Sequence, residues 1–181
     1  MCGITGIYSL KNIKNIEERI LNMNASIIHR GPDSGGVYRD NNVVLGHRRL
    51  SIIDTREVSN QPMHSNSDSL HLVFNGEIYN FDEIKSQLNY NFKTNSDTEV
   101  ILAAVEERGL DWFIEQANGM FAMALYNSLT KSLFLVRDRL GIKPLYYYLD
   151  GNNLIFSSEI KAILSSGLID AEFNDEAVDE Y

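Results

Sequence analysis

Short stretches with the composition of β-strands recur along nearly the whole chain, and this recurrence limits the fold more than any other feature. Two pairs of these stretches are separated only by turn residues, at 127–131 and 150–153, as expected for antiparallel hairpins. Because most of the stretches follow one another without an intervening helix, an alternating parallel fold is disfavoured. The predicted strands cover residues 4–9, 43–46, 70–75, 120–127, 132–137, 145–149 and 154–157.

Helical patterns enter between these strands at a few places. In residues 16–28, four apolar residues recur at spacings of three and four, which predicts a helix with one buried face. Residues 80–83 and 96–99 each combine an N-cap side chain with a glutamate three positions later, the pattern of a capping box. Helices mixed with antiparallel strands indicate an α+β layered sandwich. The predicted helices cover 16–28, 98–108 and 159–164, the second of them ended by Gly109.

The length of the chain predicts one domain. With 181 residues, 44% of them hydrophobic, the chain is long enough for one substantial core and too short for two ordinary domains. We therefore assign residues 1–181 to a single domain. Residues 173–181 have helical spacing but stop as if within a helix, so we expect the segment from about residue 170 onward to begin a linker to a further domain.

Charge and composition argue against several classes of protein. The 25 acidic residues outnumber the 16 basic ones, and the net charge of −9 disfavours nucleic acid or an anionic membrane surface as the main partner. No basic leader and no run of about 18 apolar residues occur, so we expect a cytoplasmic protein with no membrane partner. The four histidines lack metal-ligand spacing with one another and with the single cysteine, so no metal site is predicted.

The single cysteine, Cys2, directly follows Met1. Removal of Met1 would leave one residue with both a thiol and a free α-amino group. An α-amine has a reference pKa of roughly 7.7–8.0, so it can accept the thiol proton and return it to a leaving amine without a separate catalytic histidine. The alternative is that Cys2 is a small apolar residue at the start of a buried strand.

Seven short motifs are distributed over nearly the whole chain. They are residues 2–4 (CGI), 30–33 (RGPD), 47–54 (HRRLSIID), 75–80 (NGEIYN), 96–99 (SDTE), 137–147 (RDRLGIKPLYY) and 158–162 (SEIKA). Each alone is a modest indication, but all seven occur in the order of one family. On these motifs the chain resembles the N-terminal glutaminase domain of glutamine-hydrolysing asparagine synthetases, a class II glutamine amidotransferase domain.

The resemblance implies an N-terminal-nucleophile hydrolase fold, a four-layer αββα sandwich with two antiparallel sheets between helical layers. It also implies a reaction, in which the Cys2 thiolate attacks the side-chain amide of L-glutamine, ammonia is released and a thioester is hydrolysed to glutamate. The side-chain amide of Asn75 and the backbone N–H of Gly76 would bind the oxyanion of the intermediate. Locally, Asn75-Gly76 has an alternative interpretation as a tight turn between strands.

Recognition of glutamine requires groups for both its α-carboxylate and its α-ammonium end. By resemblance, Arg49 would bind the carboxylate, for which a planar guanidinium group is suited. Backbone carbonyls near Ile52 and Ile53, the Glu77 region and Asp97 would hold the ammonium group. Asp97 also has a structural alternative, because an acidic residue in the first turn of a helix usually only stabilises that helix.

Two of the motifs are predicted to be structural. Residues 30–33 end a helix with a rigid turn, because proline fixes its own φ and disfavours helix at the residue before it. The stretch of Arg137 and Asp138 with Gly141 and Pro144 is expected to be scaffold, or a docking surface for a second domain.

The family's second domain is absent from these residues. In the family, an ATP-dependent synthetase domain receives the ammonia, and its phosphate-binding Ser-Gly-Gly-x-Asp-Ser loop does not occur here. We therefore expect no cofactor in this domain, with ATP and Mg confined to a synthetase domain or subunit. A non-catalytic sensing or docking domain and an amidohydrolase for another amide stay open as alternatives, and a homodimer is also left open.

Overall fold

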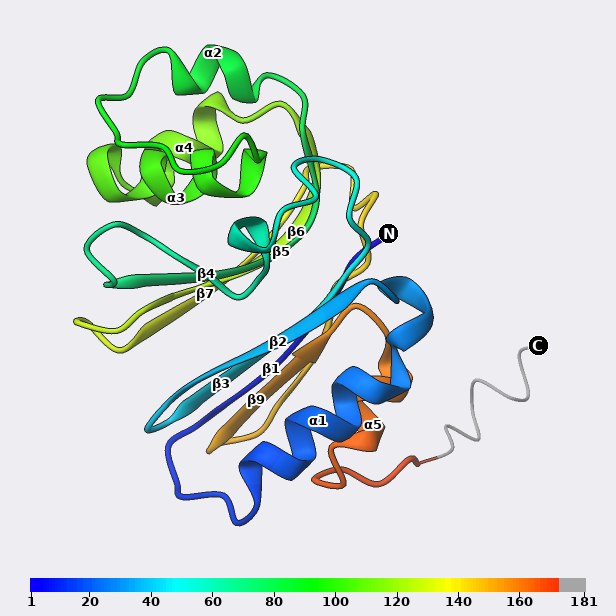
Figure 1. Ribbon diagram of the computed structural model, residues 1–181. Coiled ribbons are helices and arrows are strands. Elements are labelled where there is room, and N and C mark those ends of the chain that lie inside the picture. The colour runs from blue at the N-terminus through cyan, green and yellow to red at the C-terminus, as the bar shows by residue number, and fades with distance from the viewer. Residues whose placement is uncertain (173–181) are drawn as a thin grey trace.

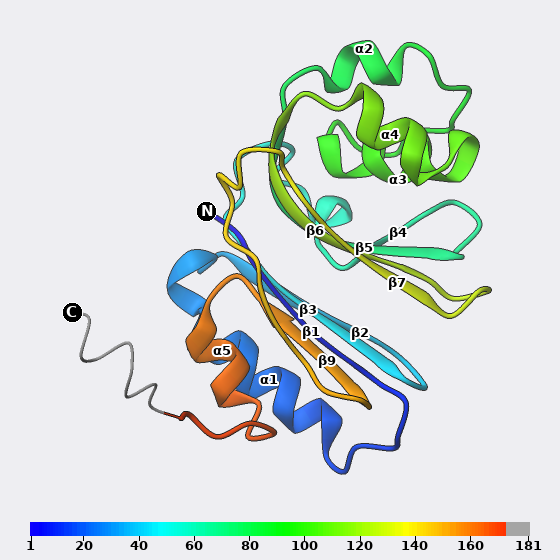
Figure 2. The same cartoon turned by 180° about the vertical axis from the view of Figure 1, so that it is seen from behind.

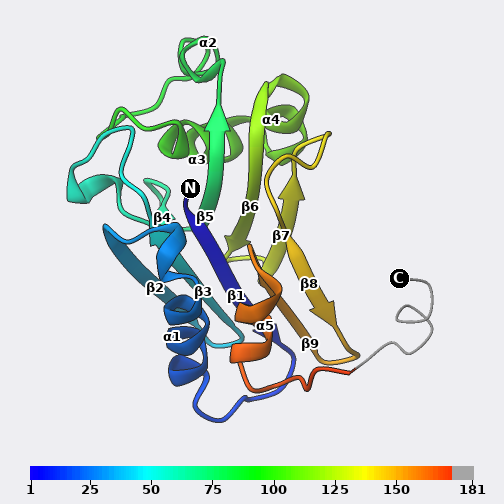
Figure 3. The same ribbon diagram turned by 90° about the vertical axis from the view of Figure 1, so that its right-hand side faces the viewer.

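In the computed structural model, residues 1–172 are described, and their strands form two antiparallel sheets. Sheet A has five strands in the order β2-β3-β1-β9-β8, and sheet B has four in the order β4-β5-β6-β7. The strands are β1 (Gly3–Ser9), β2 (Ser34–Asp40), β3 (Val43–Arg49), β4 (Met63–His64), β5 (Leu70–Ile78), β6 (Gly119–Asn127), β7 (Ser132–Arg137), β8 (Tyr146–Leu149) and β9 (Asn153–Ser157). Figure 3, turned by 90° from Figure 1, shows the strands of each sheet laid out next to one another.

Helices cover the outer face of each sheet (Figures 1 and 2). The helices are α1 (Ile16–Ser26) and α5 (Ile160–Ser165) on sheet A, and α2 (Phe81–Lys85), α3 (Asp97–Arg108) and α4 (Leu110–Gln116) on the side of sheet B. Two single 3₁₀ turns, η1 (Ile28–Arg30) and η2 (Glu57–Ser59), lie in the connections. The layers are therefore helix, sheet, sheet and helix, which confirms the predicted α+β sandwich.

Three apolar clusters fill the spaces between the four layers. The central cluster lies between the sheets and includes Ile4, Leu45, Val73 and Phe156. One outer cluster packs α3 and α4 on sheet B, and the other packs α1 and α5 on sheet A. Since β1 has a core on each of its faces, its residues are buried almost throughout, and its sequence shows no alternation of apolar and polar residues.

Gly6, in the middle of β1, allows the Phe156 ring to lie against the strand. A Cβ atom at Gly6 would come within 2.2 Å of this ring, which is fully buried. We expect Gly6→Ala to lower the free energy of unfolding by about 1–3 kcal/mol, because the ring must move within a close-packed core. Urea unfolding measures this, with Gly151→Ala as the control, since a Cβ there meets nothing within 4 Å. Equal urea midpoints for the two variants would contradict the expectation.

All seven predicted strands are present, and the main omissions are β2 and α4. The β2 sequence SGGVYRD contains two glycines and three polar residues, and this strand lies at the edge of sheet A. Its main-chain pairing with β3 runs from Ser34 to Asp40, so the neighbouring strand specifies β2 more than its own composition does. The predicted helix at 173–181 and most of the predicted linker lie outside the described residues.

The two predicted capping boxes behave differently. The Ser96 hydroxyl accepts a hydrogen bond from the Glu99 N–H at 3.3 Å and so caps α3, but the Glu99 carboxylate binds the backbone N–H groups of Lys93 and Thr94. Asn80 does not cap α2, because its side chain is bonded to the backbone near the end of α4.

Within residues 1–172, no helix has the length and apolar character needed to cross a membrane.

Candidate active site

Cys2 lies directly before β1, the central strand of sheet A. The Arg30 Nε donates to the Cys2 carbonyl oxygen at 3.0 Å, and the same guanidinium group donates to Glu159 Oε1 at 3.1 Å. The Ile4 N–H donates to the Ser158 hydroxyl oxygen at 3.0 Å. The predicted turn at 30–33 and the motif at 158–162 therefore have a shared structural role, which is to hold the start of the chain in place.

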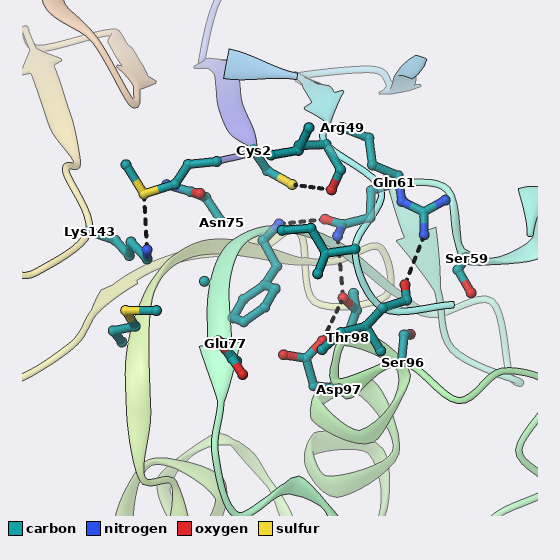
Figure 4. A pocket seen from close by; sticks show the side chains of 17 residues that line it. Cys2, Arg49, Ser59, Gln61, Asn75, Glu77, Ser96, Asp97, Thr98 and Lys143 are labelled. Carbon is teal, nitrogen blue, oxygen red and sulfur yellow. Dashed lines mark hydrogen bonds between the residues drawn. The ribbon is translucent and has the colours of Figure 1, made fainter. Parts of the chain in front are cut away.

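Cys2 lines a pocket of about 230 Å³ that receives side chains from both sheets and from the start of α3 (Figure 4). The Cys2 side chain is partly buried, and its Sγ atom lies 3.7 Å from the Leu50 carbonyl oxygen. The pocket brings together every site residue that the sequence predicted. These are Cys2, Arg49, Ile52, Ile53, Asn75, Gly76, Glu77 and Asp97.

Asn75 places an unused hydrogen-bond donor in this pocket. Its side chain is buried, and its Nδ2 has no partner among the described residues. Buried polar groups are nearly always hydrogen-bonded, so a free buried donor beside a cysteine indicates a place for a ligand oxygen. Asn75 lies inside the nine-residue strand β5, opposite Ala122 of β6. The alternative interpretation of Asn75-Gly76 as a tight turn is therefore wrong.

The Gly76 N–H points toward the same pocket. The Phe74 N–H donates to Gln61 Oε1 at 2.6 Å, and the Ile78 N–H donates to Asp97 Oδ2 at 3.1 Å. Alternate amides of a strand point to the same edge, so the Gly76 N–H lies between these two bonds and faces the pocket-lining side chains. A Cβ at this position would lie 2.3 Å from the Met120 carbonyl oxygen, and only glycine fits there.

Asp97 is a buried carboxylate that forms no ion pair within residues 1–172. It follows the N-cap residue Ser96, and its carboxylate oxygens accept from the Ile78 N–H at 3.1 Å and from the Thr98 hydroxyl at 3.5 Å. Burial raises the pKa of Asp97 to about 6, and the nearby Glu77 carboxylate acts in the same direction. Two carboxylates that repel one another at one pocket wall favour a cationic group between them.

Arg49 lies at the pocket with its guanidinium group already occupied. Its two terminal nitrogens donate to the carbonyl oxygens of Ile53, Asp54 and Arg56 and to the Asn60 side chain, at 2.6–3.2 Å. A carboxylate could therefore take the predicted place only by replacing some of these acceptors. The Ile53 carbonyl, predicted to hold an ammonium group, is one of them.

Several further residues line the pocket that were not predicted as site residues, and three of them bring polar groups that bear on the site. Ser59 is buried with its hydroxyl unpartnered, Gln61 bridges β5 and α3 through Phe74 and Thr98, and Lys143 lines the wall beside Met1. For Lys143 a sequence pattern was available, since it lies inside the 137–147 motif. Ser59 and Gln61 lie in a connection with no such pattern.

The charged side chains of the pocket are of both signs. Arg49 and Lys143 are basic, and Glu77 and Asp97 are acidic, an arrangement that suits a zwitterionic ligand such as a free amino acid. No three His, Cys, Asp or Glu side chains in residues 1–172 are grouped in a way that could hold a metal ion.

Comparison with known proteins agrees with this site. A family model described as a glutamine amidotransferase domain matches residues 1–181. The chain is 40% identical over 201 residues to a putative glutamine-hydrolysing asparagine synthetase 2 of Methanocaldococcus jannaschii, covering 100% of this chain and 39% of that protein. It is 39% identical over 168 residues to asparagine synthetase B of Escherichia coli K12, covering 91% of this chain and 30% of that protein. The chain thus spans well under half the length of these relatives.

The fold also has counterparts among solved structures. The glutamine phosphoribosylpyrophosphate amidotransferase of B. subtilis, in complex with ADP and GMP, matches with a TM-score of 0.74 and 23% identity over 92% of this chain and 44% of that chain. This likeness concerns the fold, and it supports the predicted N-terminal-nucleophile type of sandwich. Since the family model covers every residue and five of the seven motifs contribute residues to one pocket, this chain belongs to the glutamine amidotransferase domain family.

Proposed function

We propose that this domain hydrolyses the side-chain amide of L-glutamine to glutamate and ammonia through a thioester on Cys2. The observation that carries the proposal is the buried, unpartnered Nδ2 of Asn75 in the same pocket as the Cys2 thiol. An amide carbonyl attacked by Cys2 becomes an oxyanion, and a free donor pair at that place is what the intermediate requires.

The proposed chemistry uses the chain's own groups in each step. Once Met1 is removed, the α-amine of Cys2 takes the thiol proton, and the thiolate adds to the amide carbon. Asn75 and the Gly76 N–H donate to the oxyanion, which collapses to a thioester as the C–N bond breaks, and the α-ammonium group protonates the departing NH₂ group, which leaves as ammonia. Water, deprotonated by the same amine, then adds to the thioester, and the thiol leaves with glutamate as the product.

A synthetase domain is the proposed consumer of the ammonia. The relatives that this chain matches are named glutamine-hydrolysing asparagine synthetases, and this chain covers 39% and 30% of two of them. We therefore propose an ATP-dependent partner of that kind, on the same or another chain, outside these residues.

A thiol nucleophile must stay reduced, so we place the reaction in the cytoplasm.

Three amides test the proposal with protein whose mass shows that Met1 is absent. We expect release of ammonia from glutamine, and little or none from asparagine or from glutaramate, the glutamine analogue that lacks the α-amino group. Comparable hydrolysis of glutaramate would favour a less selective amidohydrolase. No hydrolysis of any of the three, with the aminothiol intact, would favour a non-catalytic sensing domain.

Glutamine binding is expected to weaken in acid because of Asp97. With a pKa of about 6, this carboxylate becomes neutral as the pH falls below 6, and its protonation should add a fall of about tenfold per pH unit to the decline in kcat/KM that protonation of the Cys2 α-amine causes. Asp97→Asn should raise KM for glutamine by about 10²-fold at pH 7.5. It should also remove the part of the fall in kcat/KM below pH 6 that protonation of Asp97 causes. Steady-state kinetics from pH 5 to about pH 8 measure both effects.

The same substitution should not destabilise the fold. The pKa of Asp97 is raised above its ordinary value of 3.8, so the folded state holds this proton more tightly than the unfolded state does, and this residue's contribution to stability falls as the pH rises from about 4 to 6. Asparagine keeps an oxygen for the Ile78 N–H and carries no buried charge. A lower urea midpoint for Asp97→Asn at pH 7.5 would show that the carboxylate serves the fold rather than the ligand.

A further inference from the structure

Lys143 is a buried lysine with no acidic partner. It is only 6% exposed and lines the same pocket as Cys2 and Asn75. Its Nζ donates to the Met1 Sδ at 3.0 Å, a contact that Figure 4 marks, and no carboxylate of residues 1–172 forms an ion pair with it. A lysine side chain carries a positive charge at neutral pH, and burying such a charge without a partner is costly.

The connection that carries Lys143 is built to hold the side chain in this place. Arg137 donates to the carbonyl oxygens of Lys143 at 2.6 Å and Gly141 at 2.5 Å, and Gly141 has the positive φ of 64° that the turn requires. The Asp138 carboxylate accepts from four backbone N–H groups and forms no ion pair with the Lys143 ammonium group among residues 1–172. These N–H groups belong to Phe121, Leu140, Ile142 and Lys143.

The position of Lys143 relates it to the nitrogen of Cys2. Met1 is the residue joined to that nitrogen, and the Met1 side chain is what Lys143 contacts. When Met1 is removed, the sulfur leaves and the Cys2 nitrogen becomes a free amine on the side that Met1 occupied. Lys143 and the α-amine then belong to residues that line the same pocket, with the space left by the Met1 side chain on the side of Lys143.

We propose that Lys143 keeps the α-amino group of Cys2 in its neutral, proton-accepting form near pH 7. This inference rests on the proposed glutaminase function. An isolated α-amine has a reference pKa of roughly 7.7–8.0 and would be mostly protonated at pH 7, and a nearby positive charge disfavours a second one. Lys143 acts through the amine and is a positioning residue for the nucleophile.

The other charges around this amine act in both directions. Arg30, on the Cys2 carbonyl oxygen, and Arg49 also disfavour a protonated amine, whereas Glu77 and Asp97 favour it. The guanidinium groups of both arginines are bonded to acceptors, to Glu159 and to loop carbonyls respectively. Lys143 differs from both arginines, because its only side-chain hydrogen bond in the described structure is to Met1, the residue that is removed.

The pH dependence of glutamine hydrolysis tests this inference. The protein is prepared with a cleavable leader cut directly before Cys2, as wild type, Lys143→Met, Lys143→Arg and Lys14→Met. The last is the control, because Lys14 is exposed and its loss changes the net charge equally. We expect Lys143→Met to move the acid limb of kcat/KM upward by about half to one pH unit, Lys143→Arg to restore it, and Lys14→Met to leave it in place.

A second readout does not depend on activity. Because Cys2 is the only cysteine, labelling with ¹³Cβ-cysteine gives one NMR resonance, and its pH titration follows the coupled amine and thiol. We expect the titration of Lys143→Met to be shifted upward by a similar amount. Superimposable titrations of wild type and Lys143→Met would overturn the inference. A shifted titration in protein that hydrolyses no glutamine would leave the inference standing and remove the proposed function.

Discussion

Replacing Cys2 by alanine is expected to reduce glutamine hydrolysis by more than about 10³-fold while leaving the fold intact. In the part of the chain that the structure describes, the thiol has one weak hydrogen bond, 3.7 Å to the Leu50 carbonyl oxygen, and the strand that follows is held through its backbone. Alanine is also small enough for Met1 to be removed, so the variant differs from wild type by the sulfur alone. Ammonia release and urea unfolding, measured on the same preparation, separate catalysis from stability.

Chemical capture makes the Cys2 experiment more specific. A diazoketone analogue of glutamine should add to wild-type protein at Cys2, with loss of nitrogen gas, and the adduct should be absent from Cys2→Ala. Glutamine in excess should protect the thiol if the two compete for the pocket. Turnover that persists in Cys2→Ala would mean that another residue supplies the nucleophile and would overturn the thioester mechanism.

Replacing Asn75 by alanine is expected to lower kcat by about 10²–10³ with little change in KM. The Nδ2 of Asn75 has no partner in the described structure, so its proposed bond forms only when an oxyanion develops. An interaction made only in the transition state affects kcat, whereas uniform binding affects KM. Steady-state kinetics with glutamine measure the two constants separately.

Asn24 provides a matched control for Asn75. It is also buried, but its side chain accepts from the Thr5 hydroxyl at 2.7 Å and donates to the Gly36 carbonyl oxygen at 3.4 Å, away from the pocket lining. Asn24→Ala should lower the free energy of unfolding by about 1–3 kcal/mol and keep kcat, because it leaves buried groups unpaired. The reverse pattern, with Asn75→Ala unstable and fully active, would assign Asn75 to the fold.

Much of the architecture could be predicted from the sequence because its signals are local. Continuous apolar runs marked the strands, and Ser96 marked the start of α3, where its hydroxyl does cap the helix. The edge strand β2 could not be predicted in this way, since its glycine-rich, polar sequence gains its structure from pairing with β3. The local sequence was also compatible with a tight turn at Asn75, and only the pairing of β5 with β6 shows that Asn75 lies within a strand.

Site residues that belong to sequence motifs could be predicted, whereas those that reach the pocket only through tertiary packing could not. Cys2, Asn75 and Asp97 were expected from motifs and share one pocket, whereas Gln61 and Ser59 enter it from an irregular connection. Asp97 also shows that the two interpretations of one residue need not compete, since it both begins α3 and lines the pocket. The occupied state of Arg49 depends on how the connection after β3 folds back, which no local pattern encodes.

The position of β1 has a consequence for biosynthesis. Residue 2 is synthesised before the rest of this domain, yet the partners of the strand that follows come from residues 43–49 and 153–157, and the Arg30–Glu159 pair that holds Cys2 needs residue 159. Such non-local contacts form only after the intervening chain has emerged. The proposed nucleophile is therefore among the first parts of this domain to be synthesised and among the last to be enclosed, so the peptide bond between Met1 and Cys2 stays accessible before the pocket exists.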